Sequence, residues 1–266
     1  MTSTSRSTSK LLLKRSAVAV ALAALYATAS ALPVFTLSPA GAGLAGANFT
    51  ADNVLISDYA TVRFGPGNTF TETGFLAITG AQLGPLTLVP GGLNSTYGMY
   101  IKFTGTGTTG AGDPGLVATS GTFTSLNYTL FGYNGPAASF GFDAGNVPTE
   151  NASGEVTLAT GSLISGTVST SVAGGGDFTP SAAAKLTFAT AAGASFFVAP
   201  VPFYNIALSS FTNTVSQVTR FDGGFKISQG GGSFNFVAAP IPEPETYALM
   251  LAGLCAVGFM VRRRSI

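Results

Sequence analysis

Chemistry in this chain is left to carboxylates, hydroxyls and aromatic rings, because its 266 residues include no histidine, no tryptophan and a single cysteine, Cys255. Without histidine, a Ser-His-Asp or Cys-His nucleophile cannot be assembled, and zinc sites that contain histidine are excluded. Cys255 lies in an apolar C-terminal run, and we expect its side chain to act there as a small apolar group and not as a reactive thiol. We therefore predict a protein that is not an enzyme and that holds no cofactor.

Four aspartates lie in glycine-rich turns, namely Asp113, Asp143, Asp177 and Asp222. Calcium takes about six to eight oxygen ligands, several of them from one loop, and none of these turns offers a dense acidic cluster. We predict that these aspartates accept hydrogen bonds from their own turns. A peripheral calcium site, and an enzyme that works through carboxylates alone, are the alternatives.

One glycine pattern resembles a nucleotide-binding motif. Gly105 to Gly110 fits G-x-G-x-x-G and follows an expected strand. A dinucleotide fingerprint must open a helix whose N-terminus holds the pyrophosphate. Residues 111–115 include two glycines and a proline and cannot start a helix, so we predict that residues 105–115 form a flexible loop.

Aromatic side chains are the remaining candidates for a binding surface. Tyr100, Phe131 and Tyr133 fall on strand faces shared with polar neighbours, which makes them the predicted sugar-contact residues. Aromatic rings are also commonly buried in the cores of β-sandwiches, and tryptophan, the favoured stacking residue, is absent. Packing in the core is the alternative that we favour for all three.

Short alternating segments must position these residues. Apolar residues occupy every second position in 97–103, and the same period recurs at 126–130, 204–208 and 225–227. Clusters of Gly, Pro and Asn separate the segments, as at 133–136. We predict an all-β fold, an antiparallel β-sandwich or jelly-roll-like domain over residues 32–240.

The charge of this domain is low. Charged residues make up 9% of the chain, against about 25% in typical soluble domains. Between residues 32 and 241 there are five basic and nine acidic residues, which leaves the domain near −4 while the whole chain is at +1. No basic patch can neutralise a row of phosphates, so we expect no nucleic-acid partner.

The N-terminus is typical of a signal peptide, residues 1–31. Its positive region contains Arg6, Lys10, Lys14 and Arg15. An apolar stretch at 16–27 follows, and Ala29 and Ala31 supply the small residues that a signal peptidase requires. A retained membrane helix needs about 20 apolar residues, so we predict cleavage before Leu32.

The C-terminus combines three elements in order. Pro242, Glu243, Pro244 and Glu245 come first, then the apolar run 247–261, then Arg262, Arg263 and Arg264. The run predicts a single short transmembrane helix, rising about 22 Å against a bilayer core of about 30 Å. The arginines favour the cytoplasmic side. The prolines keep the preceding segment extended, and so accessible to cleavage.

This arrangement over residues 241–266 resembles the PEP-CTERM sorting signal of Gram-negative bacteria that make exopolysaccharide. The resemblance implies that the membrane enzyme exosortase cleaves near Pro-Glu-Pro. The protein would be anchored transiently in the inner membrane and would then reach the cell surface or the extracellular matrix. A permanent single-pass anchor is the alternative.

The domain resembles a described group, the flocculation-associated PEP-CTERM proteins of floc-forming bacteria. The segments that carry this resemblance are 48–53, 92–98, 129–136, 159–169 and 229–233. It implies a structural or adhesive protein of the exopolysaccharide matrix, which promotes flocculation or biofilm formation by contacting exopolysaccharide or other copies of itself. The alternative is a carbohydrate-binding module that tethers exopolysaccharide to the cell surface.

Overall fold

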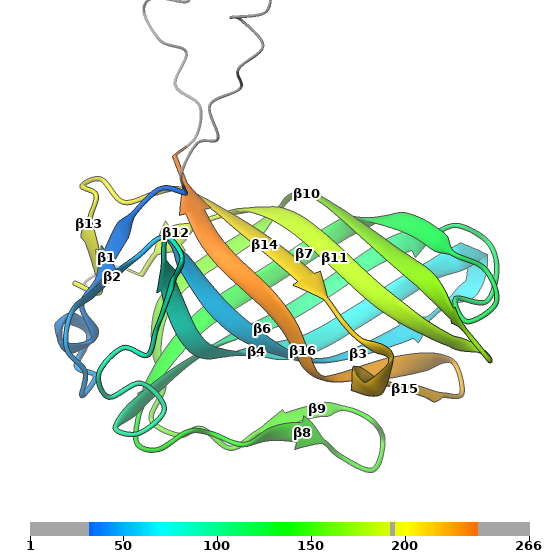
Figure 1. Ribbon diagram of the computed structural model, residues 1–266, viewed down its shortest axis with the longest axis horizontal. Helices are drawn as coiled ribbons and strands as arrows, with labels where there is room; N and C mark the ends of the chain where they lie inside the picture. Colours follow the sequence, from blue (N-terminus) through cyan, green and yellow to red (C-terminus); the bar gives the residue numbers. More distant parts are fainter. Residues whose placement is uncertain (1–31, 192–194, 239–266) are drawn as a thin grey trace, which may run out of the picture. The chain divides into compact units, whose positions relative to one another are not determined.

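Eight long strands form the body of the domain in a computed structural model that describes residues 32–191 and 195–238 (Figure 1). They are β3 (Asn53–Phe64), β4 (Thr69–Leu83), β6 (Tyr97–Thr109), β7 (Thr119–Asn134), β10 (Val156–Gly174), β11 (Asp177–Thr187), β14 (Ile206–Thr212) and β16 (Gly224–Val237). Each pairs antiparallel with the next one along the chain, and β16 returns to pair with β3. The sheet therefore closes on itself.

The predicted all-β, antiparallel fold class is confirmed. The strands join into one closed sheet, whereas a sandwich or jelly roll stacks two separate sheets. Two pairings make the difference. β16 pairs with β3 from Gly224–Arg63 to Phe234–Val54, and β10 pairs with β11 as well as with β7. Closure removes the free edges of these eight strands, which would otherwise expose unpaired backbone groups.

Short elements complete the described domain. A three-stranded sheet contains β1 (Phe35–Leu37), β2 (Phe49–Ala51) and β13 (Phe197–Ala199), and a separate hairpin contains β8 (Phe140–Phe142) and β9 (Pro148–Glu150). β5 (Leu86–Leu88), β12 (Ala189–Thr190) and β15 (Val218–Phe221) extend the main sheet. The 3-10 turns are η1 (Pro39–Ala42), η2 (Pro66–Asn68) and η3 (Val215–Gln217).

Aromatic rings fill one end of the closed sheet. Phe35 of β1 packs edge-to-face on Phe236 of β16 with ring centroids 4.9 Å apart, and Phe188 meets the same ring at 4.7 Å. Phe197 and Phe203 add further ring contacts. A void of only about 10 Å³ remains at this end. The small β1–β2–β13 sheet thus acts as a tightly packed plug.

The alternation predicted from the sequence appears in β6, where Tyr97, Met99, Ile101 and Phe103 are all buried. The prediction of a flexible loop over residues 105–115 is wrong for residues 105–109, because β6 continues to Thr109. A Cβ on Gly107 would collide with the Phe70 ring and the Thr122 carbonyl. These glycines are therefore strand residues that let neighbouring groups approach closely.

Candidate functional site

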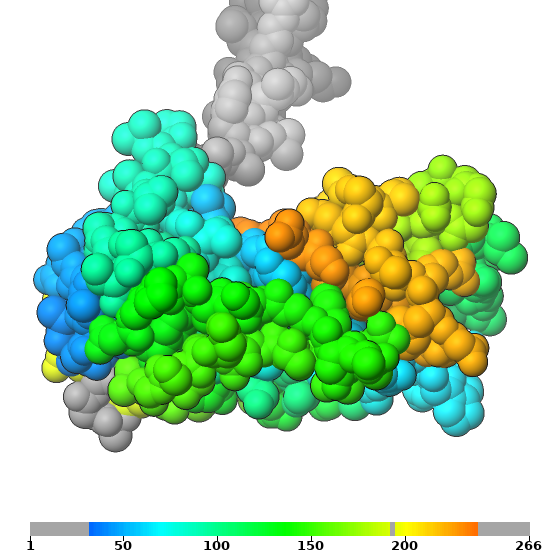
Figure 2. Space-filling model, turned by 90° about the horizontal axis from the view of Figure 1, so that it is seen from below, coloured from blue at the N-terminus to red at the C-terminus, as the bar shows by residue number. Residues whose placement is uncertain are grey.

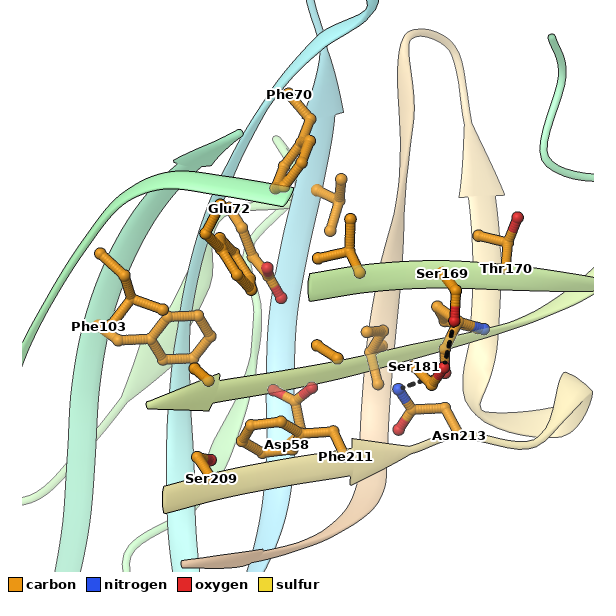
Figure 3. Close-up of a pocket in the computed structure, with 18 of the residues that line it drawn as sticks. Asp58, Phe70, Glu72, Phe103, Ser169, Thr170, Ser181, Ser209, Phe211 and Asn213 are labelled. Carbon is orange, nitrogen blue, oxygen red and sulfur yellow. Dashed lines mark hydrogen bonds between the residues drawn. The ribbon is translucent and has the colours of Figure 1, made fainter. Parts of the chain in front are cut away.

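A cavity of about 90 Å³ lies inside the closed sheet, at the end where β3–β4, β6–β7 and β10–β11 turn. All eight long strands contribute to its wall. Aromatic rings from Phe70, Phe103, Phe123, Tyr128, Phe211, Phe225 and Phe234 line it, several of them drawn in Figure 3. Phe64 also lines it and is 39% exposed, so the cavity reaches the solvent-facing end of the sheet.

Two carboxyl groups belong to this apolar wall (Figure 3). Asp58 lies on β3 and Glu72 on the neighbouring β4, and they are only 3% and 8% exposed. Asp58 points inward because it lies two residues from buried Ile56 and two residues from buried Ala60, on the same face of β3. Glu72 does so because it lies two residues after buried Phe70. The strand period that builds the core thus carries both acids into it.

Burial changes the ionisation of these acids. It raises the pKa of Glu72 to about 7 and raises the pKa of Asp58 well above its ordinary range, with the nearby Glu72 carboxyl as the second cause for Asp58. Desolvation disfavours the charged form of a carboxyl, and a like charge nearby does the same. The pair therefore retains protons at pH values where exposed carboxylates have lost theirs.

Unpartnered hydrogen-bonding atoms accompany the acids. Asp58 Oδ1, Ser209 Oγ and Asn213 Oδ1 are buried without a hydrogen-bond partner in the described part of the chain, and all three residues line the cavity. Asn213 Nδ2 donates to the Pro180 carbonyl at 3.3 Å, which leaves its oxygen free to accept. Buried polar atoms are nearly always bonded, so these atoms mark a place where a ligand can supply donors.

No lysine or arginine of the described residues lines the cavity. Three of the five basic side chains between residues 32 and 241 have hydrogen-bond partners elsewhere. Arg63 donates to the Gly145 carbonyl, Lys226 donates to Asn146 Oδ1, and Arg220 pairs with Asp113 at 2.8 Å. Among residues 32–191 and 195–238, no group of three or more acidic or thiol side chains is placed to hold a metal ion.

The aromatic residues predicted to contact sugar do lie together. Tyr100 and Phe131 have ring centroids 5.3 Å apart, and Tyr100 and Tyr133 have centroids 6.1 Å apart. Tyr100 is 2% and Tyr133 3% exposed. We call this group, together with Phe75 and the Phe140 ring that packs over it, the flap cluster.

The β8–β9 hairpin covers the flap cluster. The segment 135–155, green in Figure 2, runs across this side of the domain. It is held by hydrogen bonds from Tyr100 to Glu155 at 3.2 Å and from the Ala138 amide to Tyr133 at 2.8 Å. The rings of Tyr100 and Tyr133 therefore pack under the hairpin, and their contact with sugar stays a prediction.

The turn aspartates are placed as predicted where hydrogen bonds define them. Asp113 Oδ1 accepts from the Gly115 amide at 2.8 Å, and Asp143 Oδ1 accepts from the amides of Gly145 and Val147, both at 2.8 Å. The bonds to Arg220 and Gly115 lower the pKa of Asp113. Asp177 and Asp222 are exposed. None of the four lines the cavity.

The predicted sites at the two ends lie outside the described residues. These are the signal peptide with Ala29 and Ala31, the Pro242–Glu245 motif, the transmembrane helix 247–261 and the arginines 262–264. Within the described residues, no helix has the length and apolar character needed to cross a membrane.

Comparison with known proteins bears on the C-terminus alone. The PEP-CTERM protein-sorting motif matches residues 240–264, which confirms the predicted sorting signal. No curated protein and no solved structure matches the chain. The resemblance to flocculation-associated proteins therefore stays a prediction. The chain carries a C-terminal PEP-CTERM protein-sorting motif, the exosortase signal that implies export with transient membrane anchoring before display at the cell surface.

Proposed function

We propose that this protein is a non-enzymatic structural or adhesive component of an exopolysaccharide matrix, which promotes flocculation or biofilm formation after exosortase has processed its C-terminus. The observation that carries the proposal is an uncharged array of exposed hydroxyls on the outside of the closed sheet. The sorting motif supports it, because it implies delivery to the place where such a matrix lies.

The array, which we call the hydroxyl face, crosses three neighbouring strands. It consists of the exposed residues Thr69, Thr71 and Thr73 on β4, Thr104, Thr106 and Thr108 on β6, and Ser120, Thr122 and Thr124 on β7. Its rows are in register, with Thr71 opposite Thr106 and Thr108 opposite Thr122. Hydroxyls therefore repeat at about 7 Å along each strand and about 5 Å between strands.

Such a face suits a hydroxyl-rich partner. Hydroxyls both donate and accept, so they can replace the water on a neutral polysaccharide or on a second copy of the same face. Charge repulsion is weak, since two of the nine acids between residues 32 and 241, Asp58 and Glu72, are buried inside the sheet. Because the main sheet is closed, association with another molecule through free strand edges is restricted to short strands such as β2, β13 and the β8–β9 hairpin.

Processing at both ends is the first expected result. Intact-mass measurement on the protein from culture medium and matrix should show a form that lacks residues 1–31 and everything beyond the Pro-Glu-Pro segment. Glu243→Ala should hold the uncut form in the envelope, because it removes part of the recognised motif. Asp222→Ala, which removes an exposed acid of the domain, should be processed normally. A native chain that keeps Arg262 to Arg264 in the envelope would mean a permanent anchor.

Adhesion through the hydroxyl face is the second expected result. Thr106 and Thr124 hydroxyls are joined across β6 and β7 at 2.9 Å, and a double Thr→Val change there should weaken co-sedimentation with the producer's own polysaccharide. We expect about fivefold for each hydroxyl bond lost, since each contributes about 1 kcal/mol. Binding of the unchanged protein should vary little between about 50 and 500 mM salt, because the contact is uncharged.

A matched control exists on the plug. Thr36 and Thr50 form a similar exposed hydroxyl pair at 3.0 Å, far from the hydroxyl face in the fold, on β1 and β2. Their double Thr→Val change should leave co-sedimentation unchanged. If the two double variants lost co-sedimentation equally, the hydroxyl face would not be the binding surface. Sedimentation of the protein without polysaccharide separates self-association from polysaccharide binding.

A further inference from the structure

We propose that the cavity inside the closed sheet binds a small organic cation, an ammonium group on a compact apolar body, held by Asp58 and Glu72. This inference does not rest on the proposed matrix function. It starts from the observation that two acidic side chains, Asp58 and Glu72, lie in a cavity wall that is otherwise largely apolar. An uncompensated carboxylate in an apolar environment is costly, and it persists best where a counter-charge can reach it.

The counter-charge is not supplied by the described residues. No lysine or arginine lines the cavity, and Arg63, Arg220 and Lys226 are bonded to groups outside it. Tyr128 is the other titratable side chain in the wall, and its hydroxyl donates to the Thr187 carbonyl at 3.0 Å. A ligand from solution is thus the available source of positive charge.

The unpartnered atoms favour a ligand rich in donors. Asn213 Oδ1 can only accept hydrogen bonds, and so can Asp58 Oδ1 when Asp58 is ionised. Ser209 Oγ can accept as well. An ammonium group carries three N–H donors and no acceptor. A neutral alcohol brings a single donor and would leave more of these buried acceptors without a partner.

The wall favours an organic body over a hydrated metal ion. Eight aromatic rings line the cavity, namely Phe64, Phe70, Phe103, Phe123, Tyr128, Phe211, Phe225 and Phe234. Ring faces attract cations and also bury alkyl groups. Calcium takes about six to eight oxygen ligands, which this apolar wall does not offer.

The volume limits the size of the ligand. The cavity of about 90 Å³ is smaller than an engineered apolar cavity of about 150 Å³ that holds benzene. A chain of about four carbons with its ammonium group is a suitable probe at that scale. Phe64 lines the cavity and is 39% exposed, so a ligand would enter at this end of the sheet.

Titration calorimetry at about pH 8 on protein expressed from the full chain tests the proposal, with n-butylammonium as the probe and n-butanol as its neutral isostere. We expect saturable binding of one n-butylammonium per chain, at least about tenfold tighter than n-butanol. Asp58→Asn and Glu72→Gln should each weaken n-butylammonium binding by about tenfold or more. The matched surface change Asp222→Asn should leave it unchanged.

Protonation supplies a second readout. Since burial raises the pKa of Glu72 to about 7, the bound cation should displace a proton near that pH. The binding heat at pH 6.5 should then depend on the ionisation enthalpy of the buffer, and in Glu72→Gln this dependence should shrink. Equal affinity for the two probes, no binding of either, or undiminished binding by Asp58→Asn/Glu72→Gln would each overturn the proposal.

Discussion

The free energy of unfolding is expected to fall by about 3 kcal/mol between pH 4.5 and pH 8 through Glu72 alone, and this loss is expected to disappear in Glu72→Gln. Burial raises the pKa of Glu72 from its ordinary value of 4.5 to about 7. That difference corresponds to about 3–4 kcal/mol over the whole titration, at about 1.4 kcal/mol for each pKa unit, and about 3 kcal/mol of it is lost between pH 4.5 and pH 8. The change is large against the total stability of a domain of this size, about 5–15 kcal/mol.

The direction follows from proton linkage. The folded protein holds the Glu72 proton more tightly than the unfolded chain does. The stabilisation is therefore fully present below about pH 4.5 and is lost as the pH rises through about 7. Asp58 acts in the same direction, because burial and the Glu72 carboxyl raise its pKa. Tyr128, the other titratable group of the cavity wall, changes charge only at higher pH, since burial raises its pKa too.

Urea unfolding followed by tyrosine fluorescence at pH 5 and pH 8 measures this effect. Glu72→Gln should be more stable than the unchanged protein at pH 8 and should vary less between the two pH values. Asp222→Asn makes the same acid-to-amide change at an exposed position and should keep the native pH dependence. If Glu72→Gln lost as much stability as the native protein over this range, the buried-acid account of the pH dependence would be wrong.

Phe236→Ala is expected to lower the free energy of unfolding by about 3–5 kcal/mol. Phe236 is 2% exposed, and its ring meets Phe35 at 4.9 Å, Phe188 at 4.7 Å and Phe203 at 5.2 Å. These rings come from the plug and from the end of the closed sheet. Removing the central ring therefore opens a cavity where two parts of the fold meet.

Phe64→Ala is the matched control for the plug. Phe64 is 39% exposed and lies at the other end of the sheet, with its ring 5.9 Å from that of Phe225. Its loss should cost about 1 kcal/mol. Thermal and urea unfolding of both variants measure the difference. Equal costs would indicate that the plug adds little to the stability of the closed sheet.

The strand pattern could be predicted from the sequence because successive side chains along any strand point to opposite faces of the sheet. Tyr97, Met99, Ile101 and Phe103 mark the inner face of β6 by sequence alone. The same period would have placed Asp58 and Glu72 inside, since each is in phase with apolar neighbours such as Ile56 and Phe70. That signal was in the sequence, but an acid in an apolar phase is easily taken for a break in the pattern.

The glycines of residues 105–109 led to the wrong prediction of a loop in this part of β6. Alternating glycine and threonine is typical of a loop when neighbours are unknown. In the fold, Gly105 and Gly107 lie on the inner face of β6, where the Phe123 and Phe70 rings occupy the space that a side chain would need. The outward Thr106 and Thr108 join the hydroxyl face. Only the cross-strand neighbours distinguish a strand of this composition from a loop.

The sequence by itself determined the absence of histidine chemistry, the low charge, the antiparallel strand class and the sorting motif at 240–264, because composition, local period and a terminal motif do not depend on distant contacts. The tertiary structure decided the rest. Closure depends on pairing β3 with β16, strands that are far apart in the chain. That closure encloses Asp58 and Glu72 in one cavity, and the β8–β9 hairpin buries Tyr100 and Tyr133. Which face is enclosed and which is covered is set by long-range packing, which no local pattern records.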